Sequence, residues 1–137
     1  LFPLCQDQGV GMIIYNPLAG GFLSGKHRAG QPPEKSTRFA VAGKIYMDRY
    51  WNDPSFEAVE RLRAFFEPRR KSLLHVALAW ALAKPVVTSA IVGATSPEQL
   101  NQTLSGYQID LDQQETDRCD TVWFEIPRQR DPKIALR

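Results

Sequence analysis

Two short stretches of the chain combine small residues, hydroxyl groups and a cation in a pattern that suits anion binding. The first stretch, residues 16–26, follows an apolar run and contains three glycines within six residues before it reaches Lys26. Backbone N–H groups that small residues leave open can cradle a phosphate, and a nearby ammonium group adds attraction. The alternative is an ordinary tight turn, because glycine and proline occur in most turns. We therefore expect either a phosphate loop or a turn after this apolar run.

The second stretch leads from Gly93-Ala94-Thr95-Ser96 into Pro97-Glu98-Gln99. Serine at the N-cap, proline at the first helical position and glutamine at the third predict a helix start with a capping box. Open amides at Glu98 and Gln99, the positive end of the helix dipole and the adjacent hydroxyls favour an anion. Neither stretch contains the G-x-G-x-x-G or G-x-x-x-x-G-K-[ST] fingerprint, so neither identifies a nucleotide site by itself.

The rest of the sequence predicts elements that bring both stretches to one edge of a sheet. Apolar runs at 10–15 and 86–92 predict parallel strands buried on both faces. Periodic apolar positions and capping residues predict four helices, at 53–67, 72–84, 96–104 and 112–126. This order is typical of an α/β protein, in which ligands bind at the carboxyl ends of the parallel strands. Two strands leave edges and apolar faces that need cover, so we expect the rest of the sheet to lie outside this chain.

Capping residues and apolar spacing also predict details of these helices. Asp53, followed by proline, is expected to cap the first of the four helices. Asp112 and Glu115 repeat the capping-box pattern at the start of the last helix. Trp123 is expected to lie on the buried face of that helix, because it follows the apolar period.

The histidines, cysteines and Trp51 are predicted to have structural roles. His27 and His75 have no carboxylate or cysteine partner at a useful spacing, so surface or hydrogen-bonded histidines are favoured over metal ligands or catalytic bases. Cys5 and Cys119 are far apart in sequence, which suits unpaired, buried thiols and predicts no metal site. Trp51 is expected to pack in the core, and a place in a substrate pocket is the alternative.

Composition and charge exclude several classes of protein. The 137 residues are 43% hydrophobic and 23% charged, which is typical of one globular domain. Seventeen basic against 15 acidic residues give a formal charge of +2 without a basic block, so a nucleic-acid partner is not favoured. No apolar stretch approaches the roughly 20 residues that span a bilayer, and no signal peptide opens the chain. We expect a cytoplasmic protein without a membrane or nucleic-acid partner.

Together the two stretches resemble the aldo-keto reductase family. Residues 15–26 read YNPLAGGFLSGK, residues 90–100 read AIVGATSPEQL, and ALAWAL at 77–82 precedes the second strand. The likeness covers essentially the whole chain. Within the family, the chain looks most like the bacterial and plant reductases related to potassium-channel β subunits. It implies an α/β fold, the C-terminal part of a (β/α)8 TIM barrel, with residues 1–137 forming roughly two-fifths of that single domain.

The resemblance also implies where the parts of a nicotinamide dinucleotide would bind. Tyr15 would stack on the nicotinamide, and the glycine-rich turn would pass the ribose and pyrophosphate. Lys26 and Arg38 would reach the phosphates from residues 16–52, a long loop that covers the cofactor. The implied cofactor-binding residues are Tyr15, Asn16, Pro17, Leu18, Gly20, Gly21, Lys26, Arg38, Gly93, Thr95, Gln99, Gln102 and Thr103.

The chain departs from the family pattern where the adenosine end of the cofactor would bind. Thr95 and Gln99 match positions near the 2′-phosphate of NADP, but many members carry arginine at Gln99 and Lys-Ser at residues 93–94. Gln102 and Thr103, at the adenine, replace the common Glu-Asn pair. The resemblance therefore implies NADP and leaves NAD open. The family's catalytic Asp, Tyr, Lys and His precede this part of the barrel, so no residue here is predicted to be catalytic.

Three functional hypotheses follow from the resemblance. In the first, the chain is the NAD(P)H-binding part of an oxidoreductase that reduces aldehyde or ketone carbonyls, and it is inactive without the N-terminal barrel half as its partner. In the second, it is a dinucleotide-binding regulatory module like the channel β subunits. In the third, it is a non-functional fragment. Whether the protein forms a homo-oligomer is left open. The resemblance also implies that the tail at 127–137 helps to select a small carbonyl substrate.

Overall fold

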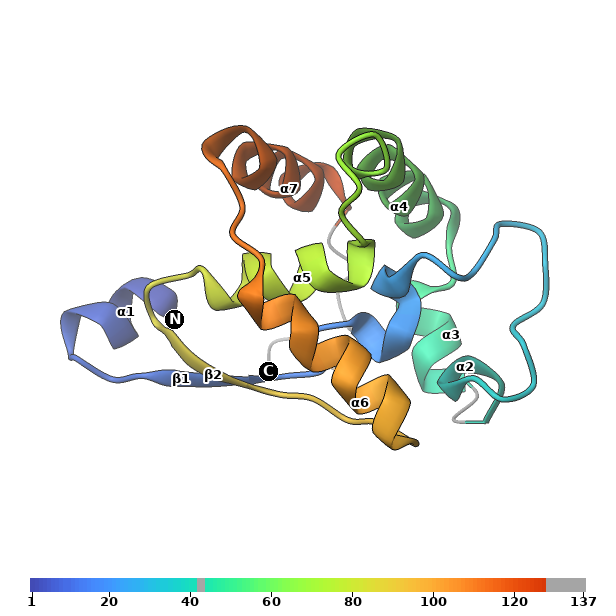
Figure 1. Ribbon diagram of the computed structural model, residues 1–137, viewed down its shortest axis with the longest axis horizontal. Coiled ribbons are helices and arrows are strands. Elements are labelled where there is room, and N and C mark those ends of the chain that lie inside the picture. The colour runs from blue at the N-terminus through green and yellow to red at the C-terminus, as the bar shows by residue number, and fades with distance from the viewer. Residues whose placement is uncertain (42–43, 128–137) are drawn as a thin grey trace, which may run out of the picture.

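The computed structural model describes residues 1–41 and 44–127, which form a two-stranded sheet with helices packed beside it (Figure 1). No helix within these residues is both long and apolar enough to cross a membrane. The predicted tail lies outside the described residues apart from Pro127. In chain order the elements are α1 (Phe2–Asp7), β1 (Met12–Tyr15), the 3-10 helix η1 (Ala19–Ser24), α2 (Arg38–Val41), α3 (Lys44–Tyr50), α4 (Asp53–Phe66), α5 (Leu73–Leu82), β2 (Val87–Ile91), α6 (Pro97–Leu104), the 3-10 helix η2 (Ser105–Gln108) and α7 (Gln113–Glu125).

Strands β1 and β2 pair in parallel, as predicted for an α/β protein. The register places Ile13 opposite Ser89 and Tyr15 opposite Ile91. Because paired parallel strands run in the same direction, both end at the same edge of the sheet. The segment after Tyr15 and the segment after Ile91 therefore leave the sheet next to each other.

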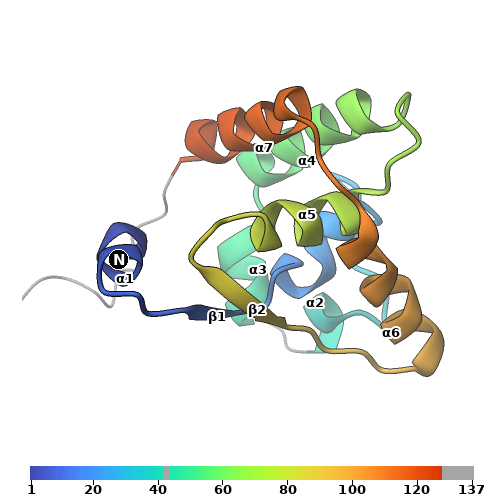
Figure 2. The same ribbon diagram turned by 60° about the vertical axis from the view of Figure 1, so that its left-hand side comes forward.

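The helices are layered on one side of the sheet. In Figures 1 and 2, α5 lies next to the strands, and α4 and α7 lie beyond it, farther from the sheet. Phe66 from α4, Val76 from α5 and Cys119 from α7 form a buried cluster where these helices meet. This packing places α5 between the strands and the two outer helices.

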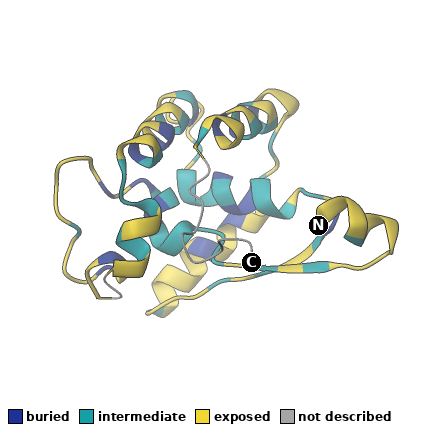
Figure 3. Ribbon diagram, turned by 180° about the vertical axis from the view of Figure 1, so that it is seen from behind, coloured by how far each residue is buried: buried dark blue, intermediate teal, exposed yellow. Residues whose placement is uncertain are grey.

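The opposite face of the sheet is uncovered, so the prediction that the strands are buried on both faces is wrong for the described residues. Side chains alternate between the two faces of a strand, and Met12 and Ile14 are partly buried. Ile13 and Tyr15 are 65% and 76% exposed, and no described element packs over them. Figure 3 shows exposed and partly buried residues along both strands. A continuous apolar run predicts two buried faces only when a second layer is present.

Residues 16–52 contain more helix than the predicted loop with short turns. They form η1, α2 and α3, which pack around an aromatic cluster. Phe22, Phe39, Phe56 and Val59 are its buried members. Because this segment is only a few short helices, its apolar residues follow no sustained period, although the cluster they form is buried.

Capping at the helix starts agrees with the predictions in part. The last helix has the predicted capping box, in which Asp112 Oδ1 accepts from Glu115 N and Glu115 Oε2 accepts from Asp112 N. The cap of α4 is Asn52, whose side chain accepts from Ser55 N, so the prediction of Asp53 is wrong by one residue. Trp123 is 55% exposed rather than buried, because its ring meets Trp80 at the edge of α5, at a centroid distance of 6.0 Å, and lies outside the buried cluster.

Replacing Phe66 with alanine should strongly destabilise this fold. Phe66 is fully buried, and a Phe→Ala change in a core lowers the free energy of unfolding by about 3–5 kcal/mol. Phe124→Ala, at an exposed position of α7, is the matched control and should change it by less than about 0.5 kcal/mol. Urea denaturation followed by circular dichroism measures both, and equal effects would contradict the packing described.

Candidate functional site

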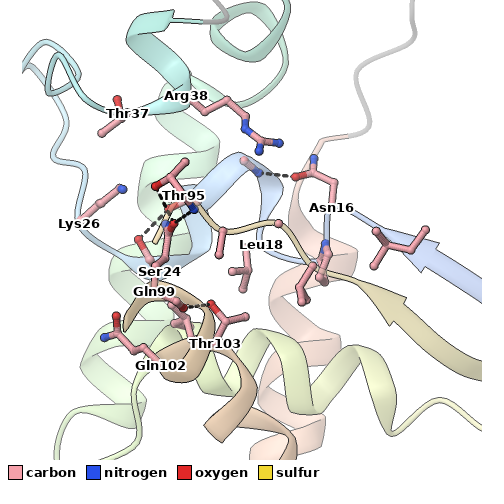
Figure 4. A pocket seen from close by; sticks show the side chains of 18 of the residues that line it. Asn16, Leu18, Ser24, Lys26, Thr37, Arg38, Thr95, Gln99, Gln102 and Thr103 are labelled. Carbon is pink, nitrogen blue, oxygen red and sulfur yellow. Dashed lines mark hydrogen bonds between the residues drawn. The ribbon is translucent and has the colours of Figure 1, made fainter. Parts of the chain in front are cut away.

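A cavity of about 560 Å³ lies at the carboxyl ends of β1 and β2. It is lined by the turn after β1, the segment from Lys26 to Arg38, the loop after β2 and one side of α6. All thirteen residues that the sequence assigns to cofactor binding line this one cavity. In Figure 4, Arg38 lies above Thr95 and Gln99, Lys26 lies to their left, and Gln102 lies below them.

The turn after β1 has a left-handed backbone, and the amides of Ala19, Gly20 and Gly21 are hydrogen-bonded within the turn. Asn16, Gly20 and Gly21 have φ angles of 57°, 70° and 95°. Asn16 Oδ1 accepts from Gly20 N at 2.7 Å, which fixes the turn (Figure 4). Glycine adopts a positive φ without steric cost, and asparagine is one of the few other residues that adopts it readily. The glycine-rich composition therefore forms a turn that also lines the cavity.

Two cations face the cavity, and no described carboxylate lines the wall beside them. The lining residues include Lys26 and Arg38 but no aspartate or glutamate. A Cβ atom built on Gly21 would lie 3.9 Å from Lys26 Nζ, so the ammonium group lies beside the turn after β1. A Cβ atom on Gly93 would lie 3.7 Å from Arg38 Nη2, so the guanidinium reaches the loop after β2. Neither cation forms a salt bridge with a described residue, which leaves both charges available to an anion.

The start of α6 differs from its predicted form. Ser96 Oγ accepts from Gln99 N at 3.2 Å, so the amide predicted to be open is already bonded. Gln99 Oε1 accepts from Thr95 N at 2.7 Å and from Thr95 Oγ1 at 3.0 Å, so it does not return to Ser96 as a capping box requires. The physical reason is that Thr95 gives Gln99 Oε1 two donors, its backbone N–H and its hydroxyl, whereas Ser96 would offer only its backbone N–H. This helix end therefore presents fewer free donors than the sequence predicts.

Glu98 adds a negative charge at the same helix end. A hydrogen bond to backbone N–H lowers the pKa of its carboxyl group, and a hydrogen bond with the Ser96 hydroxyl lowers it further. The carboxylate is fully exposed and is not part of the cavity wall. Among the described residues that line the cavity, both cations come from the segment after β1 and none comes from α6.

The remaining predicted residues differ in how freely they reach the cavity. Tyr15 is exposed at the tip of β1, beside Ile91. Thr103 is almost fully buried, and its hydroxyl donates to the Gln99 carbonyl at 2.9 Å. The Gln102 backbone carbonyl accepts from His75 Nε2 at 2.8 Å, so His75 is hydrogen-bonded as predicted. Tyr15 therefore has a free ring face, whereas Thr103 mainly shapes the wall.

Several lining residues were missed by the sequence reasoning. Tyr46 is the most informative, because it lies on α3, within a segment predicted to be loop. Serine and threonine side chains beside Arg38 also line the cavity, and a family motif gave no role to them. The residues missed are Ser24, Ser36, Thr37, Tyr46, Ser72, Leu74, Ile91, Val92 and Ala94.

His27 is buried rather than at the surface or hydrogen-bonded, which corrects the prediction for this residue. It is 5% exposed, and its ring centroid lies 4.9 Å from those of Phe39 and Trp51. Nε2 is buried and has no hydrogen-bond partner among the described residues. Burial lowers the pKa of this histidine, Lys26 lowers it further, and Glu34 opposes the shift. Trp51 packs in the same cluster, which is the core position expected for it.

Metal-binding groups and reactive thiols are not found in this site. Across residues 1–41 and 44–127, no group of three or more His, Cys, Asp or Glu side chains is placed to hold a metal ion. Burial raises the pKa of Cys119 to about 12, so this thiol stays protonated at neutral pH. The described wall of the cavity offers a ligand two cations together with hydroxyl and amide groups.

The fold and site define part of an α/β barrel with a cavity at its strand ends that Lys26 and Arg38 line, and comparisons with known proteins identify its family. The model of the "Aldo/keto reductase family" matches residues 1–123. The uncharacterized oxidoreductase YrpG of Bacillus subtilis is 32% identical over 117 residues, covering 83% of this chain and 32% of that protein. A probable voltage-gated potassium channel subunit beta of Arabidopsis thaliana is 32% identical over 108 residues, covering 78% and 33%. The NADH-specific methylglyoxal reductase of Escherichia coli is 29% identical over 111 residues, covering 81% and 33%.

A solved structure of an aldo-keto reductase has the same fold over most of this chain. The apo form of aldo-keto reductase AKR11C1 from Bacillus halodurans superposes with a TM-score of 0.62 at 22% identity, over 88% of this chain and 37% of that protein. The chain belongs to the aldo/keto reductase family of oxidoreductases, and its fold is part of a (β/α)8 barrel. It spans about a third of the length of the curated relatives it matches.

The buried His27 predicts that stability falls in mild acid. Its pKa lies below the ordinary 6.5 in the folded chain, so the unfolded chain binds the proton first as pH falls. The free energy of unfolding should therefore decrease as pH drops through 6.5 and below. His27→Phe should flatten this part of the profile in urea titrations between pH 7 and 5, whereas His75→Gln should not. A wild-type slope retained by His27→Phe would contradict the assignment.

Proposed function

We propose that the cavity binds a nicotinamide dinucleotide, NADPH in preference and NADH as an alternative, in an oxidoreductase that reduces aldehyde or ketone carbonyls. One observation carries the proposal: the two strand ends share one cavity whose wall holds two cations and no carboxylate. A dinucleotide has phosphates near its centre and flat rings at both ends, so it suits a groove that is charged in the middle and spans two loops.

The cavity wall fits such a cofactor where its phosphates would lie. Close approach of a pyrophosphate requires backbone without side chains, and Gly21 and Gly93 provide it. Lys26 and Arg38 would bind the phosphates, the lysine as a point charge and the arginine through its planar fork. When bound, the nicotinamide would supply the hydride that reduces the carbonyl carbon. The chain's own task is to hold and orient that ring, with Tyr15 offering an exposed aromatic face.

The choice between NADPH and NADH depends on the start of α6. Gln99 and Thr95 bond to each other there, and the ionised Glu98 carboxylate lies nearby. A 2′-phosphate at this position would find hydroxyl and amide groups but no cation from α6. We therefore propose only a modest preference for NADPH. The NADH-specific methylglyoxal reductase of Escherichia coli is a relative in which the other cofactor is used.

The residues that transfer the proton are proposed to lie outside this chain. The described cavity wall contains no histidine, carboxylate or unbonded lysine–tyrosine pair placed as a proton donor. The matched relatives are about three times as long, and the uncovered face that carries Ile13 and Tyr15 would pack against the rest of the barrel. We propose this remaining part of the barrel as the obligatory partner. Its absence would leave a cofactor site without catalysis.

A regulatory nucleotide-binding module is the second candidate function. The specific observation in its favour is the similarity to the potassium channel subunit beta of Arabidopsis thaliana. In this reading the dinucleotide is a signal, and the chain needs no proton donor. A cytoplasmic location suits both candidates, since Cys5 and Cys119 are unpaired.

Nucleotide affinity should depend on the two cavity cations. Lys26→Ala and Arg38→Ala should each weaken NADPH binding by about tenfold, because each removes a charged contact worth roughly 1.4 kcal/mol. Lys35→Ala is the matched control, since this lysine is exposed in the same segment but does not line the cavity. Fluorescence titration of the 137-residue chain with NADPH and NADH measures all three. Equal affinities in the three variants would contradict the site, and no binding at all would favour a non-functional fragment.

The isolated chain should show no carbonyl-dependent oxidation of NADPH. The reason is that the proposed proton donor is supplied from outside these residues. Absorbance at the nicotinamide band, measured with purified chain and a panel of aldehydes and ketones, tests this expectation. Turnover that scales with the amount of pure chain would contradict it. Turnover gained only when the rest of the barrel is joined would favour the oxidoreductase over the regulatory module.

A further inference from the structure

The Tyr46 ring lies directly on the Cα atom of Gly20, although the two residues come from separate elements. A Cβ atom built on Gly20 would lie 2.5 Å from Tyr46 Cε1 and 2.6 Å from Cδ1, which is closer than real side-chain contacts allow. Gly20 belongs to the turn after β1, and Tyr46 belongs to α3. The ring therefore occupies the volume that any larger residue at position 20 would need.

The same tyrosine contacts the cation that crosses the cavity. Arg38 Nη1 donates to the Tyr46 hydroxyl at 3.3 Å, and the guanidinium carbon lies 5.7 Å from the centre of the ring. Arg38 Nη2 extends to within 3.7 Å of the Cβ position of Gly93, on the loop after β2. The arginine thus runs from α2, past Tyr46, to the far side of the cavity. The described residues offer its guanidinium no carboxylate partner.

A second tyrosine one turn along α3 reinforces the contact with the turn. Tyr50 accepts a hydrogen bond from Asn16 Nδ2 at 3.4 Å, and its ring centroid lies 6.1 Å from that of Tyr46. Residues four apart lie on the same side of a helix, so both tyrosines face the turn. Tyr46 and Tyr50 are also at the margin of the aromatic cluster around Phe22. Helix α3 is therefore tied to the turn at two points, and Tyr46 alone also touches the cation.

We propose that Tyr46 is a positioning residue that fastens α2 and α3 to the Gly20 turn and directs Arg38 across the cavity. Gly20 is required there because its missing side chain makes room for the ring. The placement of Arg38 to bind phosphates rests on the proposed function, but the contact between Tyr46 and Gly20 does not. Loss of the ring should loosen both helices, and loss of the hydroxyl alone should disturb only Arg38.

The contact can be tested without any nucleotide by a double-mutant cycle. Gly20→Ala should speed amide hydrogen exchange in α3 about tenfold, because its Cβ atom displaces the ring. Gly30→Ala is the matched control, since Gly30 also has a positive φ, 75°, but nothing lies within 4 Å of its Cβ position. Tyr46→Ala should also speed amide hydrogen exchange in α3. When Gly20→Ala is added to Tyr46→Ala, the further increase in that exchange should be no larger than the increase that Gly30→Ala causes. Exchange in α7 reports whether the fold is intact.

Two results would overturn the proposed contact. One is that Gly20→Ala and Gly30→Ala give the same exchange in α3, since the ring would then not need the space. The other is that Gly20→Ala and Tyr46→Ala act additively. Either result would refute the fastening role, whether or not the chain binds a nucleotide.

The role of the hydroxyl is tested with Tyr46→Phe, which keeps the ring and should leave exchange in α3 unchanged. Stopped-flow release of NADPH should become about fivefold faster in this variant, with little change in the rate of binding. In an Arg38→Ala background, Tyr46→Phe should have no further effect on release. An equal effect in both backgrounds would overturn the link to Arg38. Failure of every variant and of the wild type to bind NADPH would instead refute the proposed function and leave the exchange results standing.

Discussion

The parallel register of β1 and β2 is the constraint on which the rest of the structure depends. Because Tyr15 pairs with Ile91, the two strands end together, and the segments that follow them must share one edge of the sheet. The paired residues Tyr15 and Ile91 are 76 positions apart in sequence, and the connection between two parallel strands must cross over in this way. Without this register, Lys26 and Thr95 would not line the same cavity. A shift by one residue would also reverse which side chains of β1 face the helices.

Charge and aromatic packing then act together on the cavity. The aromatic cluster around Phe22 and Phe39 anchors the segment that carries both cations, so two exposed, long side chains are held near the strand ends by buried rings. His27 lies in that cluster next to Lys26, and its burial as a neutral ring avoids a third positive charge there. The buried rings of this segment therefore hold Lys26 and Arg38 in place, and the neutral His27 adds no charge beside them.

Local chemistry could be predicted from the sequence, whereas contacts between distant segments could not. The left-handed turn at Gly20 and Gly21 and the capping box at Asp112 follow from neighbouring residue types, and both are present. Asn52 and Asp53 are adjacent and equally able to cap, so the sequence alone could not choose between them. Gln99 bonds to Thr95 because of the exact path of the loop, and the place of Tyr46 depends on how α3 packs. The predicted cofactor residues converge on one cavity, but binding itself stays a prediction.

The two-stranded sheet has a further consequence for the behaviour of these residues in a cell. Among the described residues each strand is hydrogen-bonded on one side only, and the outer side of β1 presents free amides and carbonyls next to the apolar Ile13. Open strand edges recruit other strands, which in crowded solution leads to self-association and insoluble aggregates. Further strands paired along those edges would suppress this self-association.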